Sequence, residues 1–258
     1  MTGRHVPRKR FGQHFLRDMR VIERIAAAFA PHAHDRVVEI GPGEGVLTRE
    51  LIGNVAHLDV VELDRDLAAH LREALPGTVT VHSADALTFD FCALAPPGGK
   101  LRVIGNLPYN ISTPLLFHLL DQAQCVGDML FMLQKEVVDR MASAPGGKDY
   151  GRLSVMVQYR CRVEKLFTVP PGAFQPPPKV DSAVVRLTPH ATPPVEVRDP
   201  ATFARVVQAA FSQRRKTLRN SLKGLVSAEA MTALGIDPVR RAETLSLTEF
   251  AALAGACG

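Results

Sequence analysis

The sequence predicts an α/β fold, in which an open, mostly parallel sheet carries helices on both faces and a smaller helical domain follows. Between residues 36 and 135, short β-branched runs alternate with amphipathic segments, which is the pattern of βαβ units. A Pro- and Thr-rich stretch at 188–200 then indicates a linker. We therefore expect one domain at residues 1–190 and a helical domain at 191–258.

The individual elements follow from the same patterns. Strands are expected, in chain order, at 36–40, 57–63, 78–82, 101–105, 128–133, 161–169 and 182–189. Helices are expected between them at 45–53, 64–75 and 113–123, and after the linker at 203–225, 227–235 and 246–255, with Gly224 and Gly235 as stops. Right-handed crossovers place helices on both faces of the sheet. The last two strands flank a Pro-rich loop, so they can form an antiparallel hairpin at the sheet edge.

Composition excludes several classes of protein. The 258 residues are 46% hydrophobic and 22% charged, as in ordinary globular proteins. No apolar run approaches the ~18–20 residues that span a bilayer, and the start of the chain lacks the apolar core of a secretion signal. The cysteines lie far apart without a C-x-x-C pair: Cys92, Cys125, Cys161 and Cys257. We expect reduced thiols, no metal site, no membrane contact and a cytoplasmic protein.

The positive charge is concentrated in two segments. Residues 1–20, the N-terminal basic segment, carry six basic groups and one acid. Residues 205–223, the C-terminal basic segment, carry six basic groups and no acid. Together they hold +11, which leaves the rest of the chain at −6. Such concentration favours a nucleic-acid partner, although two solvated helix faces would carry the same charge.

A glycine-rich turn follows the first predicted strand. Gly41, Gly43 and Gly45 allow a tight turn and a close approach of the backbone to a ligand at a helix N-terminus. The spacing is G-x-G-x-G, because Val46 stands where dinucleotide-binding proteins have a third glycine. This favours a phosphate-free methyl donor over a nicotinamide cofactor. A purely structural strand-to-helix turn is the alternative.

Two acids follow the next two predicted strands. Glu62 stands twenty-one residues after Gly41, where a carboxylate can accept hydrogen bonds from both ribose hydroxyls of a nucleoside cofactor. Asp85 stands where it can accept a hydrogen bond from the cofactor's adenine amino group. Asp85 alone would be read as a solvated loop acid. Because parallel strands bring their carboxyl ends to one crevice, the ordered set favours a cofactor site.

The fourth predicted strand runs into the motif Asn106-Leu107-Pro108-Tyr109. An exocyclic adenine amine is a poor nucleophile, and two acceptors that hold its N–H groups would aim its lone pair at an electrophilic methyl group. The Asn106 side-chain oxygen and the Leu107 carbonyl can serve as these acceptors. Pro108 stiffens the turn, and Tyr109 offers a face for base stacking. A structural turn with Tyr109 in the core is the alternative.

Phe174 lies on a proline-stiffened loop and is a candidate for a second wall of the base pocket. An aromatic side chain on such a loop loses little entropy when it holds a base that has left its stack. Core packing is the competing interpretation of this residue.

With these motifs in place, the sequence resembles the ribosomal RNA adenine dimethyltransferase family, and closely its bacterial small-subunit (16S) members. The matching motifs cover nearly the whole chain: 8–16, 39–45, 62–64, 85–86, 105–112, 131–136, 150–154, 174–182 and 213–220. The resemblance implies a class I S-adenosylmethionine-dependent methyltransferase fold, Rossmann-like with a seven-stranded, mostly parallel sheet, and a small helical C-terminal domain. It also implies dimethylation of two adjacent adenosines in the 3′-terminal hairpin of 16S rRNA, late in the assembly of the small subunit.

The resemblance further implies roles for individual residues. The S-adenosylmethionine site would comprise His14, Leu16, Gly41, Gly43, Glu62, Asp85, Ala86 and Asn106. The rRNA contacts would comprise Arg8, Lys9, Arg10, Arg214, Arg215, Lys216 and Arg219. Some relatives have Asn at position 14. We expect the protein to bind immature small subunits as a monomer.

Four other functions are compatible with parts of the pattern. Large-subunit rRNA methyltransferases of the antibiotic-resistance type share the N-terminal and N-x-P-Y motifs, but the segments 176–182 and 213–217 favour the small-subunit type. DNA amino-methyltransferases normally carry a target-recognition insertion, for which this chain has little room. An assembly factor with secondary methylation remains open. A nicotinamide oxidoreductase predicts glycine at position 46 and gives no reason for the basic segments.

Overall fold

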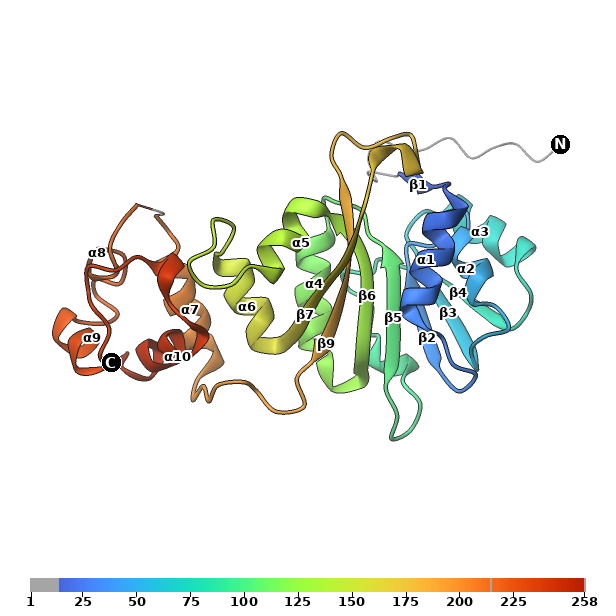
Figure 1. Ribbon diagram of the computed structural model, residues 1–258. Coiled ribbons are helices and arrows are strands. Elements are labelled where there is room, and N and C mark those ends of the chain that lie inside the picture. Colours follow the sequence, from blue (N-terminus) through green and yellow to red (C-terminus); the bar gives the residue numbers. More distant parts are fainter. Residues whose placement is uncertain (1–13, 214, 258) are drawn as a thin grey trace. The chain divides into compact units, whose positions relative to one another are not determined.

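The computed structural model describes residues 14–213 and 215–257 (Figure 1). The chain divides into two compact units. The sheet unit holds the residues up to 138 and residues 164–189, and the helical unit holds residues 139–163 and those from 190 onward. The sequence-based boundary at 190 therefore differs from the structural division, since 139–163 group with the C-terminal helices.

A seven-stranded sheet, in the order β4-β3-β2-β5-β6-β9-β7, organises the sheet unit. Its strands are β2 (Arg36–Ile40), β3 (His57–Glu62), β4 (Val79–Ser83), β5 (Leu101–Asn106), β6 (Val126–Gln134), β7 (Cys161–Val169) and β9 (Ser182–Pro189). The first five in the sheet order pair in parallel, and β9 pairs antiparallel with β6. All seven predicted strands are confirmed. The chain order reverses between β2 and β5, which is where open sheets of this kind leave a crevice.

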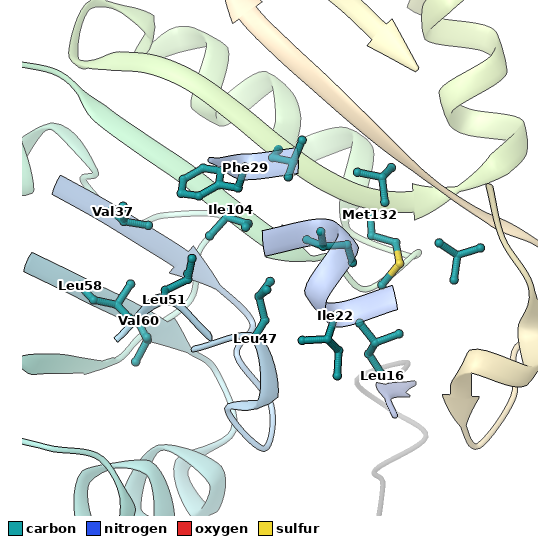
Figure 2. Packing of buried hydrophobic residues seen from close by; sticks show 14 of the residues in the cluster. Leu16, Ile22, Phe29, Val37, Leu47, Leu51, Leu58, Val60, Ile104 and Met132 are labelled. Carbon is teal, nitrogen blue, oxygen red and sulfur yellow. The ribbon is translucent and has the colours of Figure 1, made fainter. Parts of the chain in front are cut away.

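One face of the sheet is covered by α1 (Met19–Phe29) and α2 (Val46–Leu51) (Figure 2). Alternate strand residues such as Val37 and Ile104 pack there against Phe29. The intervening residue Val38 is also fully buried, because β-strand side chains alternate between faces and both faces are covered. Helix α1, which was not predicted, has Asp18 as its N-cap, and the Asp18 carboxylate accepts hydrogen bonds from two backbone N–H groups of the first turn.

The helices between the strands were predicted only in part. The three predicted helices are confirmed as α2, α3 (Arg65–Ala74) and α4 (Ser112–Asp121), whereas α5 (Lys135–Ala142) and α6 (Arg152–Arg160) were not predicted. Short 3-10 helices lie at Cys92–Leu94, Ala123–Cys125, Pro171–Ala173 and Ala242–Thr244. No helix among residues 14–213 and 215–257 is long and apolar enough to cross a membrane.

A second, two-stranded sheet attaches the start of the described chain to the sheet unit. Strand β1 (Phe15–Leu16) pairs antiparallel with β8 (Phe174–Gln175), with Leu16 opposite Phe174. The Arg17 backbone N–H extends this pairing to the Ala173 carbonyl at 2.8 Å. We call residues 14–17 the strap.

The helical unit packs α6 with α7 (Pro200–Ala210), α8 (Leu218–Ser221), α9 (Ala228–Ala233) and α10 (Leu247–Gly255). The Tyr150 hydroxyl donates to the Leu245 carbonyl at 3.0 Å, and the Tyr159 and Phe203 rings lie 4.8 Å apart. These contacts explain why 139–163 belong to this unit.

The single helix predicted at 203–225 is wrong, since α7 ends at Ala210 and α8 begins at Leu218. The Ser212 hydroxyl donates to the Ala209 carbonyl at the end of α7, and Thr217 stands at the N-cap of α8. Ser and Thr side chains favour such helix ends over helix interiors. The basic residues Arg215 and Lys216 are therefore exposed on a connection between two helices rather than on a helix face.

The prediction of four reduced cysteines is wrong for one pair. Cys92 and Cys125 form a disulfide, with their Cα atoms 5.4 Å apart. The two cysteines are 33 residues apart in the sequence, so their pairing could not be predicted from spacing. The two segments are also joined by the Gln122 side-chain oxygen, which accepts hydrogen bonds from the Phe91 and Cys92 backbone N–H groups. Cys161 and Cys257 are free, and burial raises the pKa of Cys161 to about 12.

Candidate active site

A cavity of about 340 Å³ opens at the carboxyl ends of the parallel strands, on both sides of the reversal between β2 and β5. The glycine turn after β2, the ends of β3 and β5, the loop after β4 and the strap all contribute to its lining. Its size falls within the usual range for small-molecule sites. Among the described residues, no group of three His, Cys, Asp or Glu side chains has an arrangement suited to a metal ion.

The glycine turn brings the backbone against the strap. Gly41, Gly43 and Gly45 all have positive φ, at 66°, 59° and 74°, so side chains there would be strained. A Cβ atom at Gly43 would also lie 3.0 Å from the Phe15 ring. Val46 begins α2 and lines the cavity.

Glu62 ends β3 inside the cavity, with 6% of its surface exposed. Its Oε2 accepts from the Gly43 backbone N–H at 3.2 Å, and its Oε1 accepts from the Asp64 backbone N–H at 2.9 Å. Each carboxylate oxygen has two lone pairs, so each can still accept from a ligand hydroxyl. Burial raises the pKa of Glu62, against the opposing effect of these hydrogen bonds.

Glu39 is a cavity residue that sequence reasoning did not assign to the site. It lies within β2, is 2% exposed, and its Oε2 accepts from the Thr48 hydroxyl at 2.6 Å. Burial raises the pKa of Glu39 to about 7, with a further contribution from the nearby Glu62 charge. The available signal was an acid in an otherwise apolar buried strand.

Asp85 and Ala86 line the cavity from the loop after β4. Asp85 is exposed, and its Oδ1 accepts from the Leu87 backbone N–H at 2.9 Å, which fixes the carboxylate on the loop. The loop itself is joined to β3, because the Ala84 N–H donates to the Glu62 carbonyl at 3.1 Å.

The motif from Asn106 to Tyr109, which we call the catalytic turn, leaves the end of β5 into the cavity. The Asn106 Nδ2 donates to the His14 carbonyl at 3.1 Å, so the orientation of the amide is set and its oxygen is left as the acceptor. The Leu107 N–H donates to the Met132 carbonyl of β6 at 3.2 Å. The Ile111 N–H closes the turn on the Pro108 carbonyl at 3.2 Å.

The strap lines the cavity and contacts both the glycine turn and the catalytic turn. The His14 ring lies 5.7 Å from the Tyr109 ring at an angle of 28°, and its Nδ1 is 2.8 Å from the Pro176 carbonyl oxygen. Arg17 forms a 2.5 Å ion pair with Glu44 of the glycine turn. Sequence reasoning missed Arg17 and Glu44 because ion pairs between distant segments leave no local pattern.

The structure thus brings together every predicted cofactor residue and the four residues of the catalytic turn. Residues that line the cavity are His14, Leu16, Gly41, Gly43, Glu62, Asp85, Ala86, Asn106, Leu107, Pro108 and Tyr109. Phe174 is the exception. It is 4% exposed in the hydrophobic core cluster and does not line the cavity, since its pairing opposite Leu16 holds it in the core. The structure therefore agrees with the competing interpretation of Phe174, in which this residue packs in the core.

The predicted RNA contacts are only partly described. Arg8, Lys9, Arg10 and Arg214 lie outside the described residues. Arg215, Lys216 and Arg219 are exposed in the helical unit, so their role in RNA binding stays a prediction.

The sheet order and the cavity at its carboxyl edge are those of the Rossmann-like methyltransferases. A family model described as ribosomal RNA adenine dimethylase matches residues 4–256. The chain belongs to this family, and the family prediction is confirmed. It is a ribosomal RNA methyltransferase.

Two relatives that share one name match almost the whole chain. The chain is 59% identical over 252 residues to ribosomal RNA small subunit methyltransferase A of Pseudomonas aeruginosa, which is 97% of this chain and 94% of the relative. It is 60% identical over 251 residues to the protein of that name from Nitrosococcus oceani, which is 96% of this chain and 95% of the relative.

Two solved structures show the same fold. A dimethyladenosine transferase from Plasmodium falciparum is similar with a TM-score of 0.79 at 24% identity, covering 95% of this chain and 99% of that one. The 23S rRNA methyltransferase ErmE is similar with a TM-score of 0.72 at 29% identity, covering 94% of this chain and 99% of that one.

Proposed function

We propose that this enzyme dimethylates the exocyclic amino groups of two adjacent adenosines in the 3′-terminal hairpin of 16S rRNA, with S-adenosylmethionine as methyl donor. Its substrate is the immature small subunit late in assembly, and it acts in the cytoplasm as a monomer. The names of the relatives at 59–60% identity support a small-subunit target over the large-subunit target of ErmE, to which the chain is 29% identical. The observation that carries the proposed chemistry is the catalytic turn inside the cavity, with the Asn106 amide already oriented.

The residues present fit a nucleoside-type methyl donor. Two carboxylates, Glu62 and Asp85, lie at the ends of successive strands for ribose hydroxyls and an adenine amine, and Leu16 and Ala86 add apolar surface. Gly41 and Gly43 line the cavity with backbone alone, and their positive φ disfavours side chains there. When bound there, S-adenosylmethionine supplies an electrophilic methyl group.

The chain's own residues position the nucleophile. The Asn106 oxygen and the Leu107 carbonyl accept the two N–H groups of the adenine amine, which directs its lone pair toward the methyl donor. The base stacks on Tyr109, a contact of about 1–3 kcal/mol. The nitrogen loses its proton after transfer, so a strong base is unnecessary and positioning with electrostatics accounts for the catalysis.

The helical unit supplies the charge for RNA. It carries 14 Lys and Arg against 8 Asp and Glu, whereas the sheet unit carries 17 against 18. Arg215, Lys216 and Arg219 would contact phosphates together with Arg8, Lys9, Arg10 and Arg214. Phosphate contacts position a protein on nucleic acid without reading its sequence.

The decisive experiment is methyl transfer from labelled S-adenosylmethionine to small subunits isolated from cells that lack this enzyme, followed by nucleoside mass spectrometry of the rRNA. We expect dimethyladenosine in small-subunit rRNA. Label in large-subunit RNA alone would contradict the proposed target, and tight subunit binding without transfer would indicate an assembly factor. Asn106→Ala should lose the methylation signal if transfer occurs in the cavity, whereas the control Asn54→Ala, on an exposed loop, should retain it.

A further inference from the structure

The Tyr109 ring is held at its hydroxyl by a residue from a distant segment. Tyr109 Oη lies 2.7 Å from the Ser182 Oγ. Ser182 is fully buried at the start of β9, where its backbone pairs with Gln134 of β6. A serine fixed inside the sheet therefore sets where the hydroxyl of a half-buried, cavity-lining tyrosine can lie.

The same ring is held across one face by the strap. His14 stacks on Tyr109, its Nδ1 is bonded to the Pro176 carbonyl, and its own carbonyl accepts from Asn106. Pro176 and Ser182 belong to one segment, 174–182, so this segment contacts the tyrosine directly and through the histidine. His14 stacks on one face of Tyr109 and the ring also lines the cavity, so a base that stacks on this ring must use the face opposite His14.

We propose that Ser182 is a positioning residue, which fixes the Tyr109 ring so that the target adenine stacks on the face opposite His14 with its amine at Asn106. The serine does not touch the reacting atoms. It removes the freedom of the tyrosine to tilt, and misplacement of a reactant by about 1 Å can cost 10²-fold in rate. This inference rests on the proposed role of Tyr109 in stacking the base.

The kinetic test is a double-mutant cycle of Ser182→Ala and Tyr109→Phe, measured as the single-turnover methylation rate at saturating S-adenosylmethionine and small subunits. We expect Ser182→Ala to lower the rate roughly tenfold in the wild-type background. In the Tyr109→Phe background it should have no further effect, because the hydroxyl through which Ser182 acts is already gone. A wild-type rate, or the same fold-loss in both backgrounds, would overturn the proposal. Affinity for S-adenosylmethionine should not change.

A second measurement needs neither RNA nor cofactor. The chain has three tyrosines and no tryptophan, so fluorotyrosine labelling yields three ¹⁹F resonances, of which Tyr109→Phe assigns one. Ser182→Ala should shift the Tyr109 resonance and leave those of Tyr150 and Tyr159 in place. Ser154→Ala, which removes another fully buried serine hydroxyl, should not shift the Tyr109 resonance.

These measurements separate failure of the inference from failure of the proposed function. An unshifted Tyr109 resonance in Ser182→Ala overturns the positioning role whatever the enzyme methylates. A wild-type enzyme that transfers no methyl group to small subunits refutes the proposed function, and the resonance still reports on the positioning. If the alanine variant does not fold, Ser182→Cys, which retains a small buried donor, is measured instead. We expect an intermediate shift of the Tyr109 resonance, and the absence of a shift would overturn the proposal.

Discussion

The cavity and the C-terminal basic segment present their functional side chains in opposite ways. Around the cavity, Glu39 and Glu62 are buried and Asn106 is bonded to another segment of the chain. In the basic segment, Arg215 and Arg219 are exposed. Cavity residues act through fixed geometry, so single substitutions there should have large effects. Exposed cations act through summed charge, so each substitution should have a small effect that salt can mimic.

The largest effect is expected at the catalytic turn. Asn106→Ala removes the acceptor for the adenine amine, and loss of one preorganised polar group of this kind costs about 10²–10³-fold in rate. The single-turnover methylation rate should fall by that amount while affinity for small subunits stays at the wild-type value. Asn54→Ala, an exposed asparagine that donates to the Glu50 carbonyl, should behave as wild type. If Asn106→Ala transferred methyl groups at the wild-type rate, the proposed difference in sensitivity between the cavity and the basic segment would be refuted.

The burial of Glu39 lowers the stability of the folded protein by an amount that depends on pH. Its pKa is raised from 4.5 to about 7, so between these values the folded protein binds more protons than the unfolded chain. Stability therefore falls as pH rises through this window, by about 3 kcal/mol for the full shift. Glu39→Gln should remove this decline, measured as the free energy of unfolding in urea at pH 5 and pH 8.

Two other acids, Glu62 and Glu23, serve as references for the effect of Glu39 on stability. The pKa of Glu62 is also raised and Glu62 remains in Glu39→Gln, so the difference between the two proteins reports on Glu39 together with its coupling to the Glu62 charge. Glu23→Gln, an exposed acid on α1, should leave the pH dependence as it is. If the wild type and Glu39→Gln show parallel pH curves, the burial of this carboxyl carries no such cost.

Glu62 should affect cofactor affinity. Glu62→Gln replaces one acceptor oxygen by an amide NH2 group, a donor that would face one of the two backbone N–H groups now bonded to the carboxylate. Hydrogen bonds to charged groups contribute about 1.5–3 kcal/mol, so affinity for S-adenosylmethionine should fall by about 10- to 100-fold in calorimetry. Glu73→Gln, exposed on α3, is the matched control. Wild-type affinity in Glu62→Gln would exclude this carboxylate from the cofactor site.

The smallest single effects are expected in the basic segment. Arg215→Ala, Lys216→Ala and Arg219→Ala should each weaken binding to small subunits a few-fold and lower the slope of log affinity against log salt by roughly 0.7–0.9. Lys100→Ala removes the same charge at the opposite end of β5 from Asn106 and should leave the slope unchanged. A slope insensitive to all three substitutions would show that this segment does not contact the RNA backbone.

Local patterns predicted most of the sheet unit. The β-branched runs correspond to seven strands, and the glycine turn, Glu62, Asp85 and the catalytic turn all lie where strand order places them. Helices α1, α5 and α6 were not predicted, and the single helix predicted at 203–225 is wrong, since α7 ends at Ala210 and α8 begins at Leu218. Hydrophobic periodicity predicts well whether a segment is a helix or a strand. It does not predict where a helix ends, because that depends on whether individual Ser and Thr side chains cap the helix or allow it to continue.

By itself, the sequence determined the fold class, the family and the position of the turn from Asn106 to Tyr109 at the end of a strand, where it lines the cavity, because each depends on short segments whose spacing along the chain is set by strands and turns. Only the tertiary structure decided the contacts between distant segments: the Cys92–Cys125 disulfide, the strap over the cavity, Phe174 in the core and the Ser182 hydroxyl on Tyr109. Such contacts depend on which surfaces meet after folding. That is a property of packing, and no local pattern of residue types encodes it.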